Sequence, residues 1–218
     1  MFEAHREKKA EKAYEAALAR WTEQRAEYAA LLEVATSFEG DETDEILLRN
    51  GERLFFEVTG ASLVEERRGP GHYEGASSGL SIPVATIGGR SVRYRVGAAR
   101  GHYVAGTPSP TAVDTGTVFL TNERVVFTGS SSTRECAFSK LIGVHHDDAE
   151  GTSSFAVSNR QKPMVVHYGP KVSAAFDFRT DLALAHYRGS VDDLVGHLRT
   201  ELDGIDRARP TPPAPVGT

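Results

Sequence analysis

The chain has 218 residues, of which 39% are hydrophobic, 25 are Lys or Arg, 30 are Asp or Glu and one is Cys. This composition excludes collagen, disulfide-rich scaffolds and wholly disordered chains, and the length allows a buried core with appendages. The formal charge of −5 argues against a protein that coats nucleic acid, so we expect no nucleic-acid partner.

The apolar runs are too short to cross a membrane. A spanning helix needs about 18 consecutive apolar residues, whereas the longest runs are pieces such as 54–56 and 182–185. The N-terminus carries both signs of charge and lacks the apolar stretch of a secretory signal. The single Cys136 can form no internal disulfide, which fits a reducing compartment. We therefore expect a cytoplasmic protein whose contact with a membrane, if any, is peripheral.

Residues 1–36 predict a long N-terminal helix. Positions 3–35 lack Pro and Gly and are dense in Ala, Glu, Lys, Arg and Leu, which are strong helix formers. Large side chains recur at steps of three and four, as in a coiled coil, although Arg25 interrupts the series. This stripe, the expected interaction surface of the helix, consists of Tyr14, Leu18, Trp21, Tyr28 and Leu32. Docking onto the chain's own β domain, self-association into a homo-oligomer and a solvated helix all fit the pattern.

Residues 37–50 form an expected acidic linker, and residues 51–206 an expected β domain. Within the β domain, short β-branched and aromatic runs alternate with Gly, Ser and Pro, which is typical of many strands joined by turns. Long loops are expected at 69–89 and 105–115, and a disordered Pro-rich tail at 207–218. The expected strands cover 53–59, 62–67, 91–96, 101–105, 116–121, 124–129, 134–138, 141–147, 153–158 and 164–168.

A C-terminal amphipathic helix is predicted after the strands. Apolar residues fall at helical spacing from Val191 to Ile205, and Ser190 and Asp193 stand at the spacing of a capping box. The preceding segment 180–188 fits either a helical turn or a last strand. The fold class is therefore mostly β with flanking helices, an antiparallel barrel or sandwich capped by this helix.

The segment from Gly116 to Gly129 carries a resemblance to a known family. It places two strands around Asn122-Glu123, in a pattern Gly-x-hydrophobic-x-hydrophobic-Thr-x-x-Arg-hydrophobic-x-Phe-x-Gly. This hairpin, with residues 91–97, 100–104 and 138–144, resembles bacterial GRAM-like proteins of the pleckstrin-homology (PH) superfamily. The resemblance spans about residues 50–170. It implies a PH-like barrel and a noncatalytic domain that binds lipid headgroups or protein partners.

Four arginines and no acidic residue lie between Gly88 and Tyr103, in a chain that is acidic elsewhere. On an extended strand, two of them share a face and could hold a phosphate-bearing group, as in phosphoinositide-binding PH domains, which this segment resembles. A solvated sheet face paired with Glu57, Glu65 or Glu66 is the structural alternative that also explains the pattern. The candidate ligand-binding residues are Arg90, Arg93, Arg95 and Arg100.

The segment 145–148, His-His-Asp-Asp, is the one cluster of metal-capable side chains. On a strand, His145 and Asp147 share one face, which gives two ligands where a catalytic metal needs three. No hydrolase or phosphate-loop motif occurs, and no His neighbours Cys136 in the sequence. We therefore expect no metal and no cofactor.

The sequence predicts a noncatalytic PH/GRAM-like interaction module that binds a protein partner or an anionic membrane surface. Two alternatives stay open. One is a small metal-dependent hydrolase that uses His145 and Asp147, and the other is a structural subunit that self-associates through the N-terminal helix.

Overall fold

A computed structural model describes residues 2–68, 72–77, 80–87, 90–96, 99–104 and 107–213, with side chains described in residues 5–68, apart from residue 7, and 107–213. The chain divides into two compact units, one made of residues 1–63 and 114–218 and the other of residues 64–113. Each unit is described by itself below.

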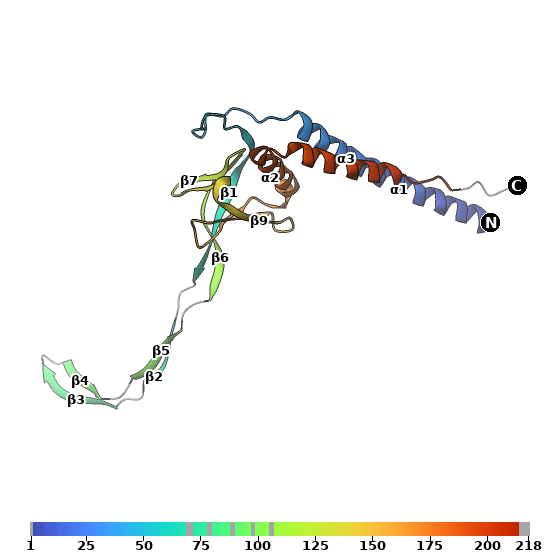
Figure 1. Cartoon of the computed structure of the whole chain (residues 1–218). Helices are drawn as coiled ribbons and strands as arrows, with labels where there is room; N and C mark the ends of the chain where they lie inside the picture. The colour runs from blue at the N-terminus through green and yellow to red at the C-terminus, as the bar shows by residue number, and fades with distance from the viewer. Residues whose placement is uncertain are drawn as a thin grey trace. The chain divides into compact units, whose positions relative to one another are not determined.

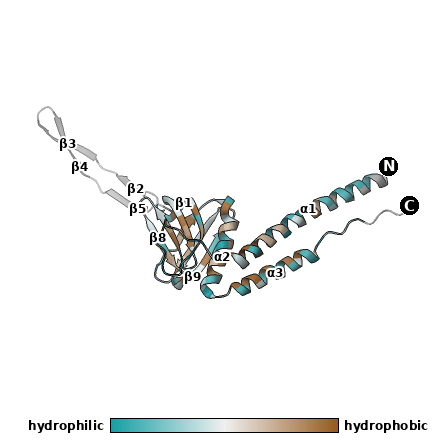
Figure 2. Cartoon of the chain, turned by 90° about the horizontal axis from the view of Figure 1, so that it is seen from above, coloured by the Kyte–Doolittle hydropathy of each residue, from teal (hydrophilic) through white to brown (hydrophobic). Residues whose placement is uncertain are grey.

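The predicted N-terminal helix is confirmed as α1 (Phe2–Ser37). It lies side by side with the C-terminal helix α3 (Val191–Arg207), and the two run in opposite directions (Figures 1 and 2). The contact buries Val195, Leu198 and Ile205 of α3. The α1 stripe turns toward this contact, because all five of its members are half-buried: Tyr14, Leu18, Trp21, Tyr28 and Leu32.

The first unit is built on a seven-stranded antiparallel sheet in the order β8-β7-β6-β1-β11-β10-β9. Its core comes from inward-facing residues of several strands, among them Phe55, Phe127 and Phe155. The strands are β1 (Leu54–Arg68), β6 (Pro108–Thr121), β7 (Arg124–Gly129), β8 (Thr133–Ala137), β9 (Leu141–Asp147), β10 (Thr152–Val157) and β11 (Met164–His167).

The seven-stranded sheet is open, whereas the barrel form of the expected fold would be closed. Strands β8 and β9 are its two edges, and only the 3₁₀ helix η1 (Phe138–Lys140) joins them. Because an extended chain covers at most about 3.6 Å per residue, this short link holds the end of one edge near the start of the other. The strand order in the described part of the chain nevertheless ends at β8 and β9, which do not pair.

Helix α2 (Ser173–Arg188) covers the sheet. The sequence analysis expected the last helix, α3, in this position. Segment 180–188, which the sequence left undecided, is therefore helical. Phe176, Leu182 and Leu184 of α2 are buried, and the Phe176 ring packs edge-on against Phe56 of β1, with ring centroids 6.2 Å apart. The apolar face of α3 packs against α1 instead. The expected capping box is wrong, since Ser190 makes no side-chain hydrogen bond at the start of α3.

The second unit contains two antiparallel ladders. Strand β2 (His72–Ser77) pairs with β5 (Ala99–Val104), and β3 (Leu80–Ile87) pairs with β4 (Arg90–Val96). The long loop expected at 69–89 is therefore wrong, and the one expected at 105–115 is mostly the start of β6. The ladder of β3 shifts register between Pro83 and Ala85, and such a bulge accommodates a residue that has no N–H to donate.

The remaining described segments are irregular. Residues 38–53 contain no helix and only an isolated bridge between Asp41 and Leu54, and residues 208–213 contain neither helix nor strand. Among the described helices, none combines the length and the apolar character that a membrane crossing requires.

Candidate functional site

The motif residues of the 116–129 hairpin stabilise the fold. Thr121 Oγ1 accepts hydrogen bonds from the N–H groups of Glu123 and Arg124, which fixes the turn. Arg124 binds buried Glu52 at two points, with Nε 2.7 Å from Oε1 and Nη2 3.1 Å from Oε2, and it also donates to the Leu47 carbonyl. The hairpin thereby holds the end of the linker against the sheet. Its Thr and Arg are occupied within the chain and are not free for a ligand.

Glu52 is the member of this network that the sequence analysis missed, because it stands next to an acidic segment that predicts a solvated linker. Its side chain is fully buried. Burial alone would raise its pKa, but hydrogen bonds from Arg124, from the Arg49 N–H and from Thr121 hold the pKa below its ordinary value. The carboxylate is therefore ionised and paired inside the protein.

The other end of the hairpin is fixed by Asp114. Its carboxylate accepts hydrogen bonds from the N–H groups of Ser131 and Ser132. The bond from the Ser131 N–H, followed by the bond from the Ser130 hydroxyl, lowers its pKa. A Cβ at Gly129 would overlap this carboxylate, and one at Gly116 would overlap the Thr128 carbonyl. Neighbouring atoms therefore leave no room for a side chain at either motif position, which requires glycine at both.

A second polar group, here called the α2 polar cluster, lies between α2 and the strands β9 to β11. It comprises His146, Asp148, Ser153, Tyr168, Ser173 and Asp177. His146 Nδ1 lies 2.6 Å from Ser153 Oγ and 2.7 Å from Asp177 Oδ1. Ser153 Oγ lies 2.5 Å from the Tyr168 hydroxyl. Ser173 Oγ donates to Asp148 Oδ1 at 2.7 Å.

This cluster has the residue types of a Ser-His-Asp hydrolase but not its geometry. In such a relay the serine and the carboxylate contact opposite ring nitrogens, whereas Ser153 and Asp177 both contact Nδ1 of His146. The Ser153 residue is also 0% exposed, so its hydroxyl cannot reach a substrate. The cluster is a partly buried network that joins elements of the fold.

The hydrolase alternative gains no support from His145 and Asp147. Both are exposed, and Asp147 accepts a hydrogen bond from the Glu150 N–H in the β9–β10 turn. The predicted division of faces along the strand is correct, since His146 is the residue that turns inward. Within the part of the chain that the structure describes, no three His, Cys, Asp or Glu side chains are placed to hold a metal ion.

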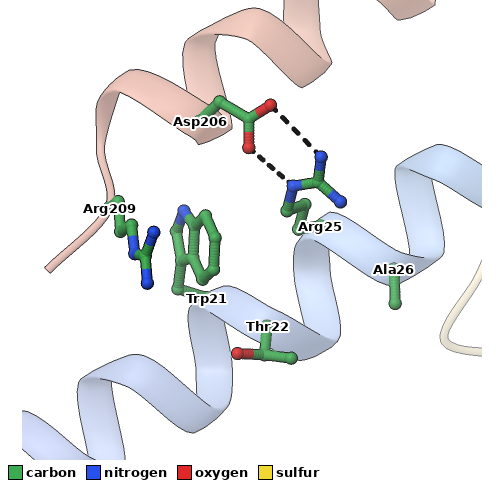
Figure 3. A pocket seen from close by; sticks show the side chains of 6 residues that line it. All are labelled: Trp21, Thr22, Arg25, Ala26, Asp206 and Arg209. Carbon is green, nitrogen blue, oxygen red and sulfur yellow. Dashed lines mark hydrogen bonds and ion pairs between the residues drawn. The ribbon is translucent and has the colours of Figure 1, made fainter.

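Trp21 lines two hollows on the α1–α3 pair, of about 530 and 390 Å³. Figure 3 shows the side chains around the first of them. The Trp21 Nε1 donates to the Ile205 carbonyl at 2.7 Å, and the Arg209 guanidinium lies over the Trp21 ring, 5.3 Å from the centroid. Arg25, the residue that interrupts the stripe, pairs with Asp206 at 2.6 Å. These polar groups therefore bind the two helices to each other.

The edge strand β9 differs from these sites because no described strand pairs with its outer side. A register shift leaves Ile142 without a partner, since Gly143 pairs with Ala156 and Leu141 pairs with Val157. Ile142 is 71% exposed, and a Cβ built on Gly143 meets nothing within 4 Å. Bulges at sheet edges re-aim side chains in this way, and the free side of an edge strand presents unpaired backbone N–H and C=O groups. We take β9 as the candidate binding site.

The predicted ligand-binding arginines fall on β4 and β5 of the second unit. Their backbone is described, with Arg93 opposite Pro83 and Arg95 opposite Ser81. Their side chains lie outside the described residues, so their convergence on a ligand stays a prediction. These four arginines are Arg90, Arg93, Arg95 and Arg100.

Cys136 is buried, and burial raises the pKa of its thiol.

Comparisons of the chain with protein-family models, with curated proteins and with solved structures give no match.

Proposed function

We propose that the chain is a noncatalytic interaction module that binds an extended segment of a protein partner along strand β9. The supporting observation is the 71% exposure of Ile142 on an edge strand whose free side no other described strand covers. The proposal includes membership of the PH/GRAM-like group that the hairpin resembles. The order of helix, antiparallel strands and C-terminal helices supports that membership.

The kind of partner follows from the chemistry of the edge. Unpaired N–H and C=O groups along β9 need complementary backbone groups, and only an extended chain offers them in series. Ile142 adds an apolar anchor, and Gly143 leaves room for close approach. The exposed His145 and Asp147 are polar positions at the other end of the strand. The expected partner is therefore an extended peptide with an apolar residue opposite Ile142.

The experiment uses a phage-displayed library of random linear peptides, selected on the full chain. The matched variants are Ile142→Arg and Leu47→Arg, since Leu47 is also a large exposed apolar residue, at 91%, but lies outside the sheet. Selected peptides should lose binding to Ile142→Arg by at least about tenfold and keep binding to Leu47→Arg. Equal loss in both variants, or in neither, would reject the β9 site.

A second candidate is the binding of an anionic, phosphate-bearing surface by the second unit. Residues 64–113 contain six Arg, no Lys and three Glu, a formal charge of +3, which leaves −8 on the remainder of the chain. Such segregation of charge favours contact with anionic groups. This candidate would place the protein at a membrane surface without inserting it.

A further inference from the structure

Helix α3 ends beside Trp21, well before α1 reaches its N-terminal end. The Trp21 Nε1 donates to the Ile205 carbonyl, and α3 ends at Arg207. Because the two helices run in opposite directions, residues 2–16 of α1 extend past the end of α3, a length of about 22 Å at about 1.5 Å per residue. Tyr14, a member of the α1 stripe, lies in this extension. The stripe therefore continues beyond the helix that packs on it.

The Pro-rich tail (residues 208–218) begins at the same place. Figures 1 and 2 show its described part continuing past α3 toward the N-terminal end of α1. The Arg209 guanidinium lies over the Trp21 ring. Pro210 is half-buried and lines the hollow of about 390 Å³ with Ala17 and Trp21, whereas the three residues after it are exposed. The first residues of the tail thus pack on α1 where its extension begins.

The composition of the tail favours a polyproline II helix. Residues 210–217 contain four Pro and no charged residue. A polyproline II helix has three residues per turn and rises about 3.1 Å per residue, so Pro210 and Pro213 share one edge, about 9.3 Å apart. On α1, Trp21 and Tyr14 share a face and are about 10.5 Å apart along the helix axis. A tail of this form that follows α1 from Pro210 therefore brings Pro213 to Tyr14.

The α1 surface between these two rings has the chemistry that a polyproline II segment needs. Such segments pack proline rings against aromatic side chains, and their backbone carbonyls are free to accept hydrogen bonds. Trp21 and Tyr14 supply the aromatic surfaces, and the small Ala17 between them leaves room for close approach. Arg20 and Gln24 line the same hollow and carry N–H groups that can donate to the tail carbonyls. The surface therefore fits an apolar segment with free carbonyls.

We propose that the α1 surface from Tyr14 to Trp21 is a docking site for a polyproline II segment, and that residues 210–217 of the same chain occupy it. The structure places Pro210 at the site, and docking of the next turn brings Pro213 onto Tyr14. The length of the tail supports this occupant, because from Pro210 it reaches about 22 Å, as far as α1 extends past α3. The site contains no residue of β9, so it does not rest on the proposed function.

The first test measures ¹⁵N relaxation of the full chain. The amides of Thr211, Ala214 and Val216 should give order parameters above about 0.6, because the docked tail moves with α1. Values below about 0.6 at Ala214 and Val216 would mean that the tail is solvated, and would overturn the docking site.

The second test uses two double variants of the tail. Pro212→Ser with Pro213→Ser removes two proline rings. Thr211→Ser with Ala214→Ser is the control, because these positions share the third edge of the polyproline II helix, which points away from α1 when the other two edges pack on it. The first double variant should lower the order parameters of the residues that follow to below about 0.6, and should speed hydrogen exchange of the α1 amides 12–18 by about threefold or more. The control should match the wild type, and the same response in both would overturn the proposal.

A third measurement identifies the copy that supplies the tail. In a mixture of ¹³C-labelled and unlabelled protein, nuclear Overhauser contacts between Pro213 and the Tyr14 ring should arise within single copies. Contacts that cross from labelled to unlabelled copies would show that a second copy occupies the site, and would overturn the proposal. None of these measurements uses a peptide partner, so failure of this docking site and failure of the β9 site are distinguishable.

Discussion

Arg124 and Glu52 form a two-point ion pair inside the protein, although they stand 72 positions apart in the sequence. The Glu52 side chain is fully buried and that of Arg124 is 11% exposed. Arg124 also binds Glu135 of β8 at 2.8 Å, so a single guanidinium connects the linker, the hairpin and an edge strand. The arginine of the Gly116–Gly129 motif therefore stabilises the fold.

The first prediction concerns this ion pair. Arg124→Ala leaves Glu52 buried without its partner and should lower the free energy of unfolding by about 3–5 kcal/mol. Urea denaturation followed by circular dichroism measures the loss. Arg199→Ala, on the exposed side of α3, is the control and should change stability by less than about 0.5 kcal/mol. Comparable losses in both variants would show that the pair has no special role.

The second prediction concerns acid stability at Asp114. Its folded-state pKa lies below the ordinary value of 3.8, so its contribution is present above that pH and is lost as the pH falls through the folded value. Asp114→Asn should therefore destabilise the protein at pH 7 and reduce the dependence of stability on pH in the acid range. Unfolding midpoints measured from pH 7 down to the lowest pH at which the protein stays folded check this, with exposed Asp44→Asn as the control. Parallel curves for Asp114→Asn and the wild type would contradict it.

The third prediction concerns the α1–α3 pair. Trp21→Phe keeps an aromatic ring but loses the bond to the Ile205 carbonyl, and should cost about 1 kcal/mol. Trp21→Ala should cost more, about 2–3 kcal/mol, because it also removes a half-buried ring. Neither variant should change the molar mass in light scattering, since the helix docks within its own chain. A drop in mass without loss of stability would show that the stripe joins separate chains.

The fourth prediction concerns the basic second unit. Arg93→Glu with Arg95→Glu should reduce binding to vesicles containing phosphatidylserine by at least about tenfold. Lys8→Glu with Lys9→Glu makes the same change in net charge on exposed positions of α1, and should leave binding unchanged. Cosedimentation with these vesicles, and with phosphatidylcholine alone, provides the measurement. Equal loss in both double variants would show that binding depends on net charge alone and not on Arg93 and Arg95.

The sequence predicts local elements well where one signal dominates. The helix α1 follows from an uninterrupted run of strong helix formers, and the β6–β7 hairpin from alternating apolar residues around a turn. The position on the sheet that was expected for α3 is occupied by α2, because the amphipathic pattern of α3 predicts one apolar face without saying which surface covers it. Helix α2 was left undecided because Leu182-Ala-Leu-Ala is apolar on consecutive positions and shows no period.

The polar networks were beyond sequence reasoning for a different reason. Alternation along β9 correctly separates His145 from His146, but only the tertiary fold decides which face is inside. The partner of His146, Asp177, comes from a helix that the sequence did not define. In the same way, Glu52 follows a run of acids, and nothing local distinguishes it as the buried carboxylate that pairs with Arg124. The exposure of Ile142 depends on a shift of ladder register, which has no local signal.

The most direct test of the central claim is residue-resolved hydrogen exchange of the full chain, with and without a selected peptide at saturating concentration. Binding along the edge should increase the protection of backbone amides within Leu141–Asp147 and leave β7 (Arg124–Gly129), beside the opposite edge of the sheet, unchanged. New protection confined to other segments, with none along β9, would contradict the claim that this edge receives the partner.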